Sequence, residues 1–149
     1  MGDSIFNLGD LLDAVGAVLG PDDPALIHGD RVISWPQMTA RSNNVARNLR
    51  ERGAETGDKA GFYLRNQPEY MEALAACFKG RFTHVNVNYR YLDDELHYIF
   101  DNSDAAIVVF DREFRENVEP THQTSRSPTK HWRQRAMARR SRSSAPMTT

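Results

Sequence analysis

The first hydrophobic pattern along the chain has the period of an α-helix. Asn7 precedes it as a suitable N-cap, and Gly20-Pro21 follows it as a stop signal. Between these signals the apolar residues recur every three or four positions, which places them on one face: Leu8, Leu11, Leu12, Val15, Val18 and Leu19. The pattern predicts an amphipathic helix over residues 8–19.

A β-hairpin is predicted next. The runs 25–28 (Ala-Leu-Ile-His) and 31–34 (Arg-Val-Ile-Ser) are rich in β-branched and apolar residues. They flank Gly29-Asp30, and two such runs around two turn residues are typical of a hairpin.

A second helix follows the hairpin directly. Ser34 can cap it, with Gln37 three residues on as the reciprocal partner of a capping box. Gly53 lies beyond the expected end, where a left-handed cap residue is favourable. Four apolar residues are expected to face inward: Met38, Val45, Ala46 and Leu49.

From residue 59 onward, short apolar runs alternate with helical patterns. The runs predict strands over residues 59–64, 83–87 and 105–110. The patterns between and after them predict helices over residues 68–79, 92–102 and 111–118. Strands joined by long helical crossovers are parallel, and such crossovers are right-handed.

These elements predict an α/β fold. It contains a partial doubly wound parallel sheet of three strands with crossover helices, preceded by a helix and a β-hairpin. Because three strands make a small sheet, we expect its edge strands to be exposed.

The distribution of charge divides the chain of 149 residues in two. Residues 1–119 hold 12 basic and 20 acidic residues, a net charge of -8, whereas residues 120–149 hold 7 basic and no acidic residues. The second segment also contains no Leu, Ile, Val or Phe. A segment of this composition cannot bury enough apolar surface to offset its ordering entropy. We therefore predict one domain over 1–119 and a disordered basic tail over 120–149.

Several classes of protein are excluded by the sequence. No apolar stretch approaches the ~18 residues of a transmembrane helix, and the N-terminus lacks the basic and apolar regions of a secretory signal. Phe6 stands where a myristoylation signal needs Ser or Thr. Cys77 is the single cysteine, so the chain has no intramolecular disulfide and no cysteine-based zinc cluster. We expect a soluble protein of a reducing compartment, the cytoplasm.

Two side-chain patterns could carry chemistry. His97 lies four residues from both Asp93 and Asp101, a spacing that suits a metal or proton-transfer site on one helix face. We favour a solvated polar face, because no other ligand-type residue converges with them in sequence. Cys77 could be a nucleophile, but it shares the apolar face of its predicted helix, so we favour a small buried hydrophobe.

Aromatic residues cluster after the second predicted strand: Tyr89, Tyr91, Tyr98 and Phe100, with Arg90 among them. They could stack on a nucleotide or line an acyl pocket, but packing between elements explains them without a ligand. A phosphate-binding loop needs glycines that let backbone N–H groups approach the anion. All nine glycines lie at or before Gly80, and residues 124–130 (Thr-Ser-Arg-Ser-Pro-Thr-Lys) contain none. We assign no catalytic, cofactor-binding or metal-binding residue.

Several strings in the chain are specific in combination. They are residues 24–30 (Pro-Ala-Leu-Ile-His-Gly-Asp), 40–46 (Ala-Arg-Ser-Asn-Asn-Val-Ala), 57–66 (Gly-Asp-Lys-Ala-Gly-Phe-Tyr-Leu-Arg-Asn), 86–91 (Asn-Val-Asn-Tyr-Arg-Tyr) and 99–105 (Ile-Phe-Asp-Asn-Ser-Asp-Ala). With them, residues 7–119 resemble the N-terminus of AMP-forming fatty acyl-CoA synthetases, members of the adenylate-forming ligase superfamily. The resemblance implies a parent reaction in which a fatty acid, ATP and CoA give acyl-CoA, AMP and pyrophosphate, with Mg and CoA bound by the full-length enzyme.

The chain also departs from the family pattern. Residues 80–85 lack the proline that precedes the strand there, and no phosphate loop or C-terminal lysine domain of the family follows residue 119. We therefore expect a truncated fragment that is not catalytic alone, with residues 120–149 resembling translation in a shifted reading frame.

Two alternative functions remain open. The chain could be an interaction module that completes a split ligase with a complementary chain, and its exposed apolar faces could also lead to self-association. Alternatively, the basic tail could bind nucleic acid without sequence specificity, or an anionic membrane surface.

Overall fold

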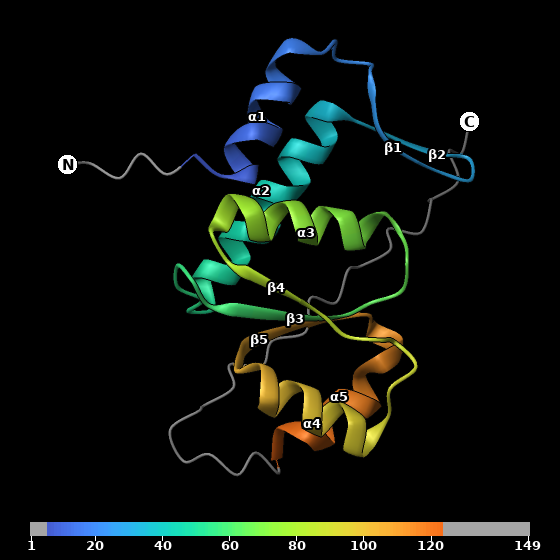
Figure 1. Ribbon diagram of the computed structural model, residues 1–149. Coiled ribbons are helices and arrows are strands. Elements are labelled where there is room, and N and C mark those ends of the chain that lie inside the picture. The colour runs from blue at the N-terminus through green and yellow to red at the C-terminus, as the bar shows by residue number, and fades with distance from the viewer. Residues whose placement is uncertain (1–5, 124–149) are drawn as a thin grey trace, which may run out of the picture.

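The computed structural model describes residues 6–123 of the chain. Within that range, a parallel sheet lies between two helical layers (Figure 1). The first layer holds α1 (Leu8–Val18), α2 (Trp35–Glu51) and α3 (Pro68–Gly80), together with the hairpin strands β1 (Pro24–His28) and β2 (Arg31–Ser34). The second layer holds α4 (Asp93–Ser103), a 3₁₀ turn (Arg112–Phe114) and α5 (Arg115–Gln123).

The sheet consists of β3 (Lys59–Tyr63), β4 (Thr83–Asn86) and β5 (Ala105–Phe110) in the order β4-β3-β5. Both pairings are parallel, and Phe62 at the centre pairs with Asn86 on one side and Val109 on the other. The crossover from β3 to β4 passes through α3, and the crossover from β4 to β5 passes through α4 on the opposite face (Figure 1). The predicted doubly wound α/β fold with a preceding helix and hairpin is confirmed.

The local start and stop signals act as predicted. At α1, the Asn7 side chain accepts a hydrogen bond from the Asp10 backbone N–H, and the Asp10 side chain accepts one from the Asn7 N–H, both at 3.0 Å. At α2, the Ser34 N–H donates to the Gln37 side chain across 3.1 Å. Gly53 after α2 has a φ of 92°, the left-handed backbone that its position required.

Two hydrophobic clusters cover the two faces of the sheet. Ile107 and Val109 pack in the cluster shared with α2 and α3, whereas Val108 and Phe110 pack in the cluster shared with α4 and α5. This alternation follows from the two-residue period of a strand. Burying each such side chain contributes about 1.5–3 kcal/mol, so both helical layers are held to the sheet by apolar contact.

The expectation of exposed edge strands is wrong for β5. Four of its residues, from Ile107 to Phe110, are only 3–6% exposed, because apolar side chains from both helical layers cover them. The other edge strand, β4, is partly exposed, with Thr83 and Asn86 open to solvent.

The apolar stripe of α1 is largely uncovered. Four of its six members are exposed at 39–82%: Leu8, Leu11, Val18 and Leu19. The helix instead approaches α3 through Gly9, where an added Cβ would lie 2.7 Å from the Lys79 Cα. The amphipathic spacing correctly placed these four residues on one side of the helix. No helix or strand within residues 6–123 covers that side.

The last helix extends further than expected. α5 continues to Gln123, past the predicted domain end at 119, with Pro120 inside it. The rest of the predicted tail, residues 124–149, lies outside the described residues. Among the residues described, no helix combines the length and apolarity needed to cross a bilayer.

Candidate functional site at the carboxyl edge of the sheet

The carboxyl ends of β3 and β5 form a topological switch point. The chain leaving β3 turns toward α3 in one layer, and the chain leaving the neighbouring β5 turns toward α5 in the other (Figure 1). In open α/β sheets, ligands bind in the crevice that such a divergence leaves. The residues that reach this edge are 64–67, after β3, and 111–114, after β5.

Asp111 closes this crevice from the β5 side. Its carboxylate accepts a hydrogen bond from the Arg65 backbone N–H at 3.0 Å and another from the Gln67 side-chain amide at 2.7 Å. Burial raises the pKa of Asp111 above its usual value, and these two hydrogen bonds oppose the shift without cancelling it. The carboxylate therefore ties the loop after β3 to the end of β5.

Arg65 and Glu113 form a two-point ion pair beside Asp111. Arg65 Nε lies 2.6 Å from Glu113 Oε1, and Arg65 Nη2 lies 3.3 Å from Oε2. The guanidinium also lies over the rings of Tyr89 and Phe114, at 5.2 and 5.3 Å from their centroids. The hydrogen bonds between the two partners raise the pKa of Arg65 and lower the pKa of Glu113.

Tyr63 connects three elements beneath this ion pair. Its buried hydroxyl donates to the Tyr91 carbonyl at 2.6 Å and accepts a hydrogen bond from the Asn117 side chain at 3.2 Å. The hydrogen bonds from Arg65 and Gln67 to Asp111 and Glu113 join the end of β3 to the end of β5. We call these four residues the clamp.

A second polar cluster lies between α3 and β4. The Tyr70 hydroxyl donates to Asn86 Oδ1 at 3.1 Å and lies 2.8 Å from His84 Nε2. Since a hydroxyl has one proton, His84 Nε2 acts as the donor in this arrangement. Burial lowers the pKa of His84 and raises the pKa of Tyr70, so both side chains favour their neutral forms.

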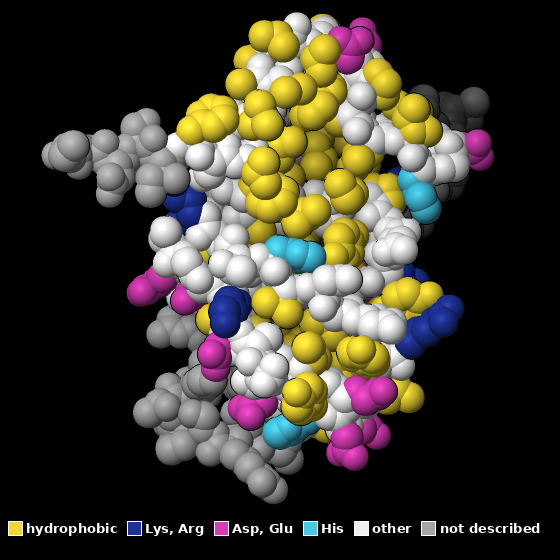
Figure 2. All heavy atoms as spheres, in the orientation of Figure 1, with side chains coloured by type: hydrophobic (Ala, Val, Ile, Leu, Met, Phe, Trp, Pro, Cys, Tyr) yellow, Lys and Arg dark blue, Asp and Glu magenta, His cyan; other side chains and the backbone are white. Residues whose placement is uncertain are grey.

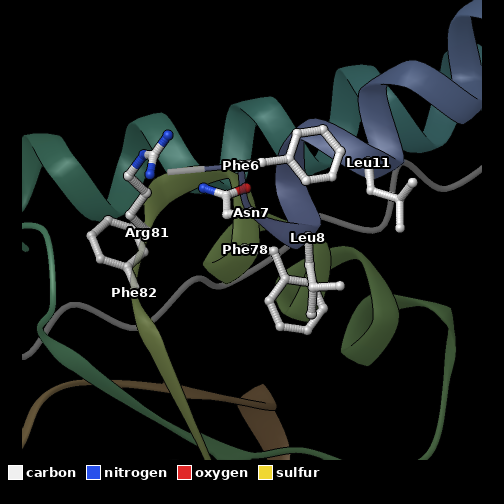
Figure 3. Close-up of a pocket in the computed structure, with 7 residues that line it drawn as sticks. All are labelled: Phe6, Asn7, Leu8, Leu11, Phe78, Arg81 and Phe82. Atoms are coloured by element: carbon white, nitrogen blue, oxygen red, sulfur yellow. The ribbon is translucent and has the colours of Figure 1, made fainter. Parts of the chain in front are cut away.

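Two shallow grooves border α3. A groove of about 500 Å³ lies near its C-terminus and is lined by Phe6, Asn7, Leu8, Leu11, Phe78, Arg81 and Phe82. In Figure 3, rings and leucine side chains from α1 and α3 turn toward this groove, and Arg81 lies at the opposite end from Leu11. A groove of about 310 Å³ near the N-terminus of α3 is lined by Leu26, Ile27, His28, Asn66, Gln67, Pro68, Tyr70 and Met71.

Hydrophobic side chains line most of both grooves. Figure 2 shows hydrophobic side chains gathered over α1 and α3 in the upper half of the molecule. We call this surface the apolar face and define it by six residues that line the grooves: Phe6, Leu8, Leu11, Ile27, Met71 and Phe78. Five of them are large hydrophobic side chains with exposures of 42–69%.

Cys77 and His97, the two side chains that the sequence suggested for chemistry, differ in their surroundings. Cys77 is fully buried among apolar residues, and burial raises the pKa of its thiol to about 12, which confirms a packing role. His97 is half-buried on α4, and no group of three potential metal ligands converges anywhere in residues 6–123.

The aromatic cluster is divided. Tyr89, Tyr91 and Phe100 pack against the cluster under α4 and α5, as favoured, whereas Tyr98 is 67% exposed. The clamp residues Arg65 and Asp111 were not singled out from the sequence. The available signal was their position: Arg65 directly follows the predicted strand 59–64, and Asp111 directly follows the predicted strand 105–110. The residues that follow neighbouring parallel strands meet at the carboxyl edge of the sheet.

Comparison with known proteins defines the class. A family model described as AMP-binding enzyme matches residues 16–146, beyond the predicted domain end at residue 119. The chain therefore belongs to the AMP-binding enzyme family, and the resemblance to acyl-CoA ligases found in the sequence is confirmed.

Individual relatives are CoA ligases. The chain is 43% identical over 114 residues to 3-oxocholest-4-en-26-oate–CoA ligase of Rhodococcus rhodochrous, covering 76% of this chain and 20% of that protein. It is 39% identical, with the same coverage, to a medium/long-chain-fatty-acid–CoA/3-oxocholest-4-en-26-oate–CoA ligase of Mycobacterium marinum. The chain thus spans about a fifth of the length of these curated relatives.

Solved structures agree on the fold. A benzoate CoA ligase from Burkholderia xenovorans superposes with a TM-score of 0.74 at 16% identity, over 80% of this chain and 24% of that one. The O-succinylbenzoate CoA synthetase of Bacillus subtilis, solved with AMP, gives a TM-score of 0.66 at 25% identity, over 73% of this chain and 29% of that one.

Proposed function

We propose that this chain supplies the N-terminal part of an AMP-forming acyl-CoA ligase and does not catalyse the reaction alone. The parent reaction joins a carboxylic acid to ATP, releasing pyrophosphate, and then transfers the acyl group to CoA, releasing AMP. The observation that carries the proposal is the 43% identity to a CoA ligase of which the matched segment is only 20%.

We place no ATP or magnesium site on residues 6–123, and three observations support that choice. The carboxylate of Asp111 already accepts two hydrogen bonds, and Glu113 is paired with Arg65. Residues 6–123 bring no three potential metal ligands together. Charge on a transferring phosphoryl group requires cations or donors aimed at it. We therefore assign the binding of ATP, Mg and CoA to the rest of the family's chain and derive no catalytic step from these residues.

The substrate proposed for the parent enzyme is an apolar carboxylic acid. Fatty acids are the acids suggested by the sequence resemblance, and a fatty-acid activity is named for the Mycobacterium marinum relative. A steroid side-chain carboxylate is the second candidate, because the names of both relatives include 3-oxocholest-4-en-26-oate. A reducing, cytoplasmic compartment belongs to the same proposal.

Pyrophosphate release tests the proposal. The purified chain is incubated with ATP, Mg, CoA and either a panel of fatty acids or 3-oxocholest-4-en-26-oate. We expect release at the level of a no-protein control with every acid. Turnover by the chain alone would refute the claim that it is not catalytic.

The apolar face favours a second role, in which the chain completes a split ligase in trans. Apolar surface of this kind marks interaction sites. The test mixes the chain with the Rhodococcus rhodochrous relative from which the matched segment has been deleted. We expect the two polypeptides to co-purify and the mixture to release pyrophosphate, whereas separate elution of the two chains would count against this role.

Residues 120–149 remain a separate prediction. Reading the gene in the two other frames downstream of codon 119 decides whether a frameshift produced them: the ligase continuation must appear in one of those frames. Binding of nucleic acid or anionic membranes by this segment is expected to weaken as salt is raised.

A further inference from the structure

The outer side of α4 presents one exposed aromatic ring among carboxylates. Leu96 and Phe100 pack in the core and are 0% and 4% exposed, whereas Tyr98 is 67% exposed. The acidic residues three or four positions from Tyr98 lie on its side of the helix, and all of them are exposed: Asp94, Glu95 and Asp101. We call these three residues and Tyr98 the α4 face. Figure 2 shows acidic side chains gathered over α4 in the lower part of the molecule.

The ion pairs formed within residues 6–123 leave out the α4 face. They do not involve Asp94, Glu95 or Asp101. The ring contacts within the same range do not include Tyr98. Helix α4 itself contains no lysine or arginine. The face therefore combines an uncovered ring with negative charge that this part of the chain does not neutralise by ion pairing.

Elsewhere in this structure a ring and a carboxylate bind one arginine together. Arg65 lies 5.2 Å from the Tyr89 ring centroid, and its Nε lies 2.6 Å from Glu113 Oε1. A guanidinium can make both contacts because its plane stacks on the ring while its N–H groups point to the carboxylate. The α4 face offers the same two kinds of group, so its chemistry fits an arginine-rich chain.

The segment of residues 124–149 has the composition that this face would bind. It contains six arginines, one lysine and no acidic residue. It directly follows α5, which packs beside α4 in the same layer (Figure 1). Because the segment belongs to the same chain, its effective concentration at the face is of the order of millimolar. A separate basic partner lacks that advantage.

The distances along the chain allow the contact. Lys130 follows Gln123, the end of α5, by seven residues, which span at most about 25 Å when extended. The eleven residues of α4 form a helix about 16 Å long. The basic residues of the segment can therefore reach any part of the α4 face.

We propose that segment 124–149 binds the α4 face of its own chain, with an arginine over the Tyr98 ring and in contact with the neighbouring carboxylates. The contact occupies the basic residues of the segment, so nucleic acid or an anionic membrane would compete with α4 for them. It does not depend on the proposed ligase role, and its tests need no ATP, carboxylic acid substrate or complementary chain.

Carbodiimide cross-linking of the full-length chain tests the contact. The reagent joins a lysine amine to an adjacent carboxylate, and Lys130 is the single lysine of the segment. In the monomeric fraction we expect mass spectrometry to find Lys130 joined mainly to the α4 face, with a yield that falls as salt is raised. Cross-links spread evenly over the exposed acids of both layers would overturn the proposal. Links to α4 found only in dimers would overturn it as well.

Two double variants separate the α4 face from the net charge of the chain. Asp94→Asn with Asp101→Asn, and Asp22→Asn with Asp30→Asn, each remove two negative charges from exposed positions. The first should lower the yield of the Lys130–Glu95 cross-link at least about threefold. The second, in the turns on either side of β1, should leave that yield unchanged. Equal lowering by both would mean that net charge alone attracts the segment, which would overturn the proposed face.

Tyr98→Leu tests the aromatic ring. Leucine keeps an apolar side chain on the face but lacks the π surface that attracts a guanidinium, so the Lys130–Glu95 yield should fall about twofold or more. Phe6→Leu is the matched control, because Phe6 is 69% exposed in the other helical layer. It should leave the yield unchanged. Circular dichroism checks that every variant folds. An unchanged yield in Tyr98→Leu would overturn the role given to the ring.

Discussion

Arg41 on α2 donates a hydrogen bond to Glu72 on α3 across 2.8 Å, and the Glu72 side chain is only 2% exposed. Arg41 is 34% exposed, and Glu72 also interacts electrostatically with Arg31, so the loss of Arg41 leaves part of the charge of Glu72 compensated. We therefore expect Arg41→Ala to lower the free energy of unfolding by about 1–2 kcal/mol, measured by urea denaturation. Arg47→Ala, at an exposed position of the same helix, should change it by less than about 0.5 kcal/mol. Equal effects of the two variants would contradict this role.

The approach of α1 to α3 gives a paired test on two glycines. An added Cβ at Gly9 would lie 2.7 Å from the Lys79 Cα, whereas one at Gly16 would lie 3.4 Å from the Thr39 hydroxyl oxygen. Alanine favours a helix over glycine by up to ~1 kcal/mol, so Gly16→Ala should be stabilising or neutral. Gly9→Ala should destabilise by about 1–3 kcal/mol because the helices must separate. Thermal denaturation of both variants measures the difference, and a stabilising Gly9→Ala would show that the close crossing is absent.

Cys77 should be inert toward thiol reagents in the folded chain. The thiolate is the reactive form, and burial raises the pKa of this thiol to about 12. At pH 8 we expect a disulfide reagent to label the native protein far more slowly than the urea-unfolded protein. Rapid labelling without denaturant would mean that α3 opens readily from the sheet.

His84 should make stability depend on pH near neutrality. Burial lowers its pKa below 6.5, so as pH falls below that value the unfolded chain takes up a proton that the folded chain resists. The contribution of neutral, buried His84 to the free energy of unfolding is therefore fully present above pH 6.5. This contribution decreases as the pH falls from 6.5 through the folded-state pKa. We expect the urea midpoint to drop between pH 7.5 and pH 5.5.

Two variants test whether His84 causes this drop in the urea midpoint. His84→Gln should reduce the drop, whereas His28→Gln, at an exposed position of β1, should keep it. A drop of the same size in His84→Gln would assign it to other groups.

The sequence predicted the elements that depend on local signals. The cap at Asn7, the pair Ser34–Gln37 and the left-handed Gly53 each involve residues close in the chain, and the structure contains all three. The contacts that were missed join distant residues. Arg65 and Asp111 are 46 positions apart, and Tyr70 and His84 meet only because α3 packs over β4. Periodicity likewise assigns Leu8 and Leu11 to one face of a helix without showing whether anything covers that face.

Both faces of β3 and β5 are already covered by side chains that precede residue 119. The central sheet of this segment is therefore enclosed by the segment's own side chains, before any later part of a ligase emerges from the ribosome. Within residues 6–123, the flank of α1 and α3 keeps a large apolar surface that is available for assembly after translation.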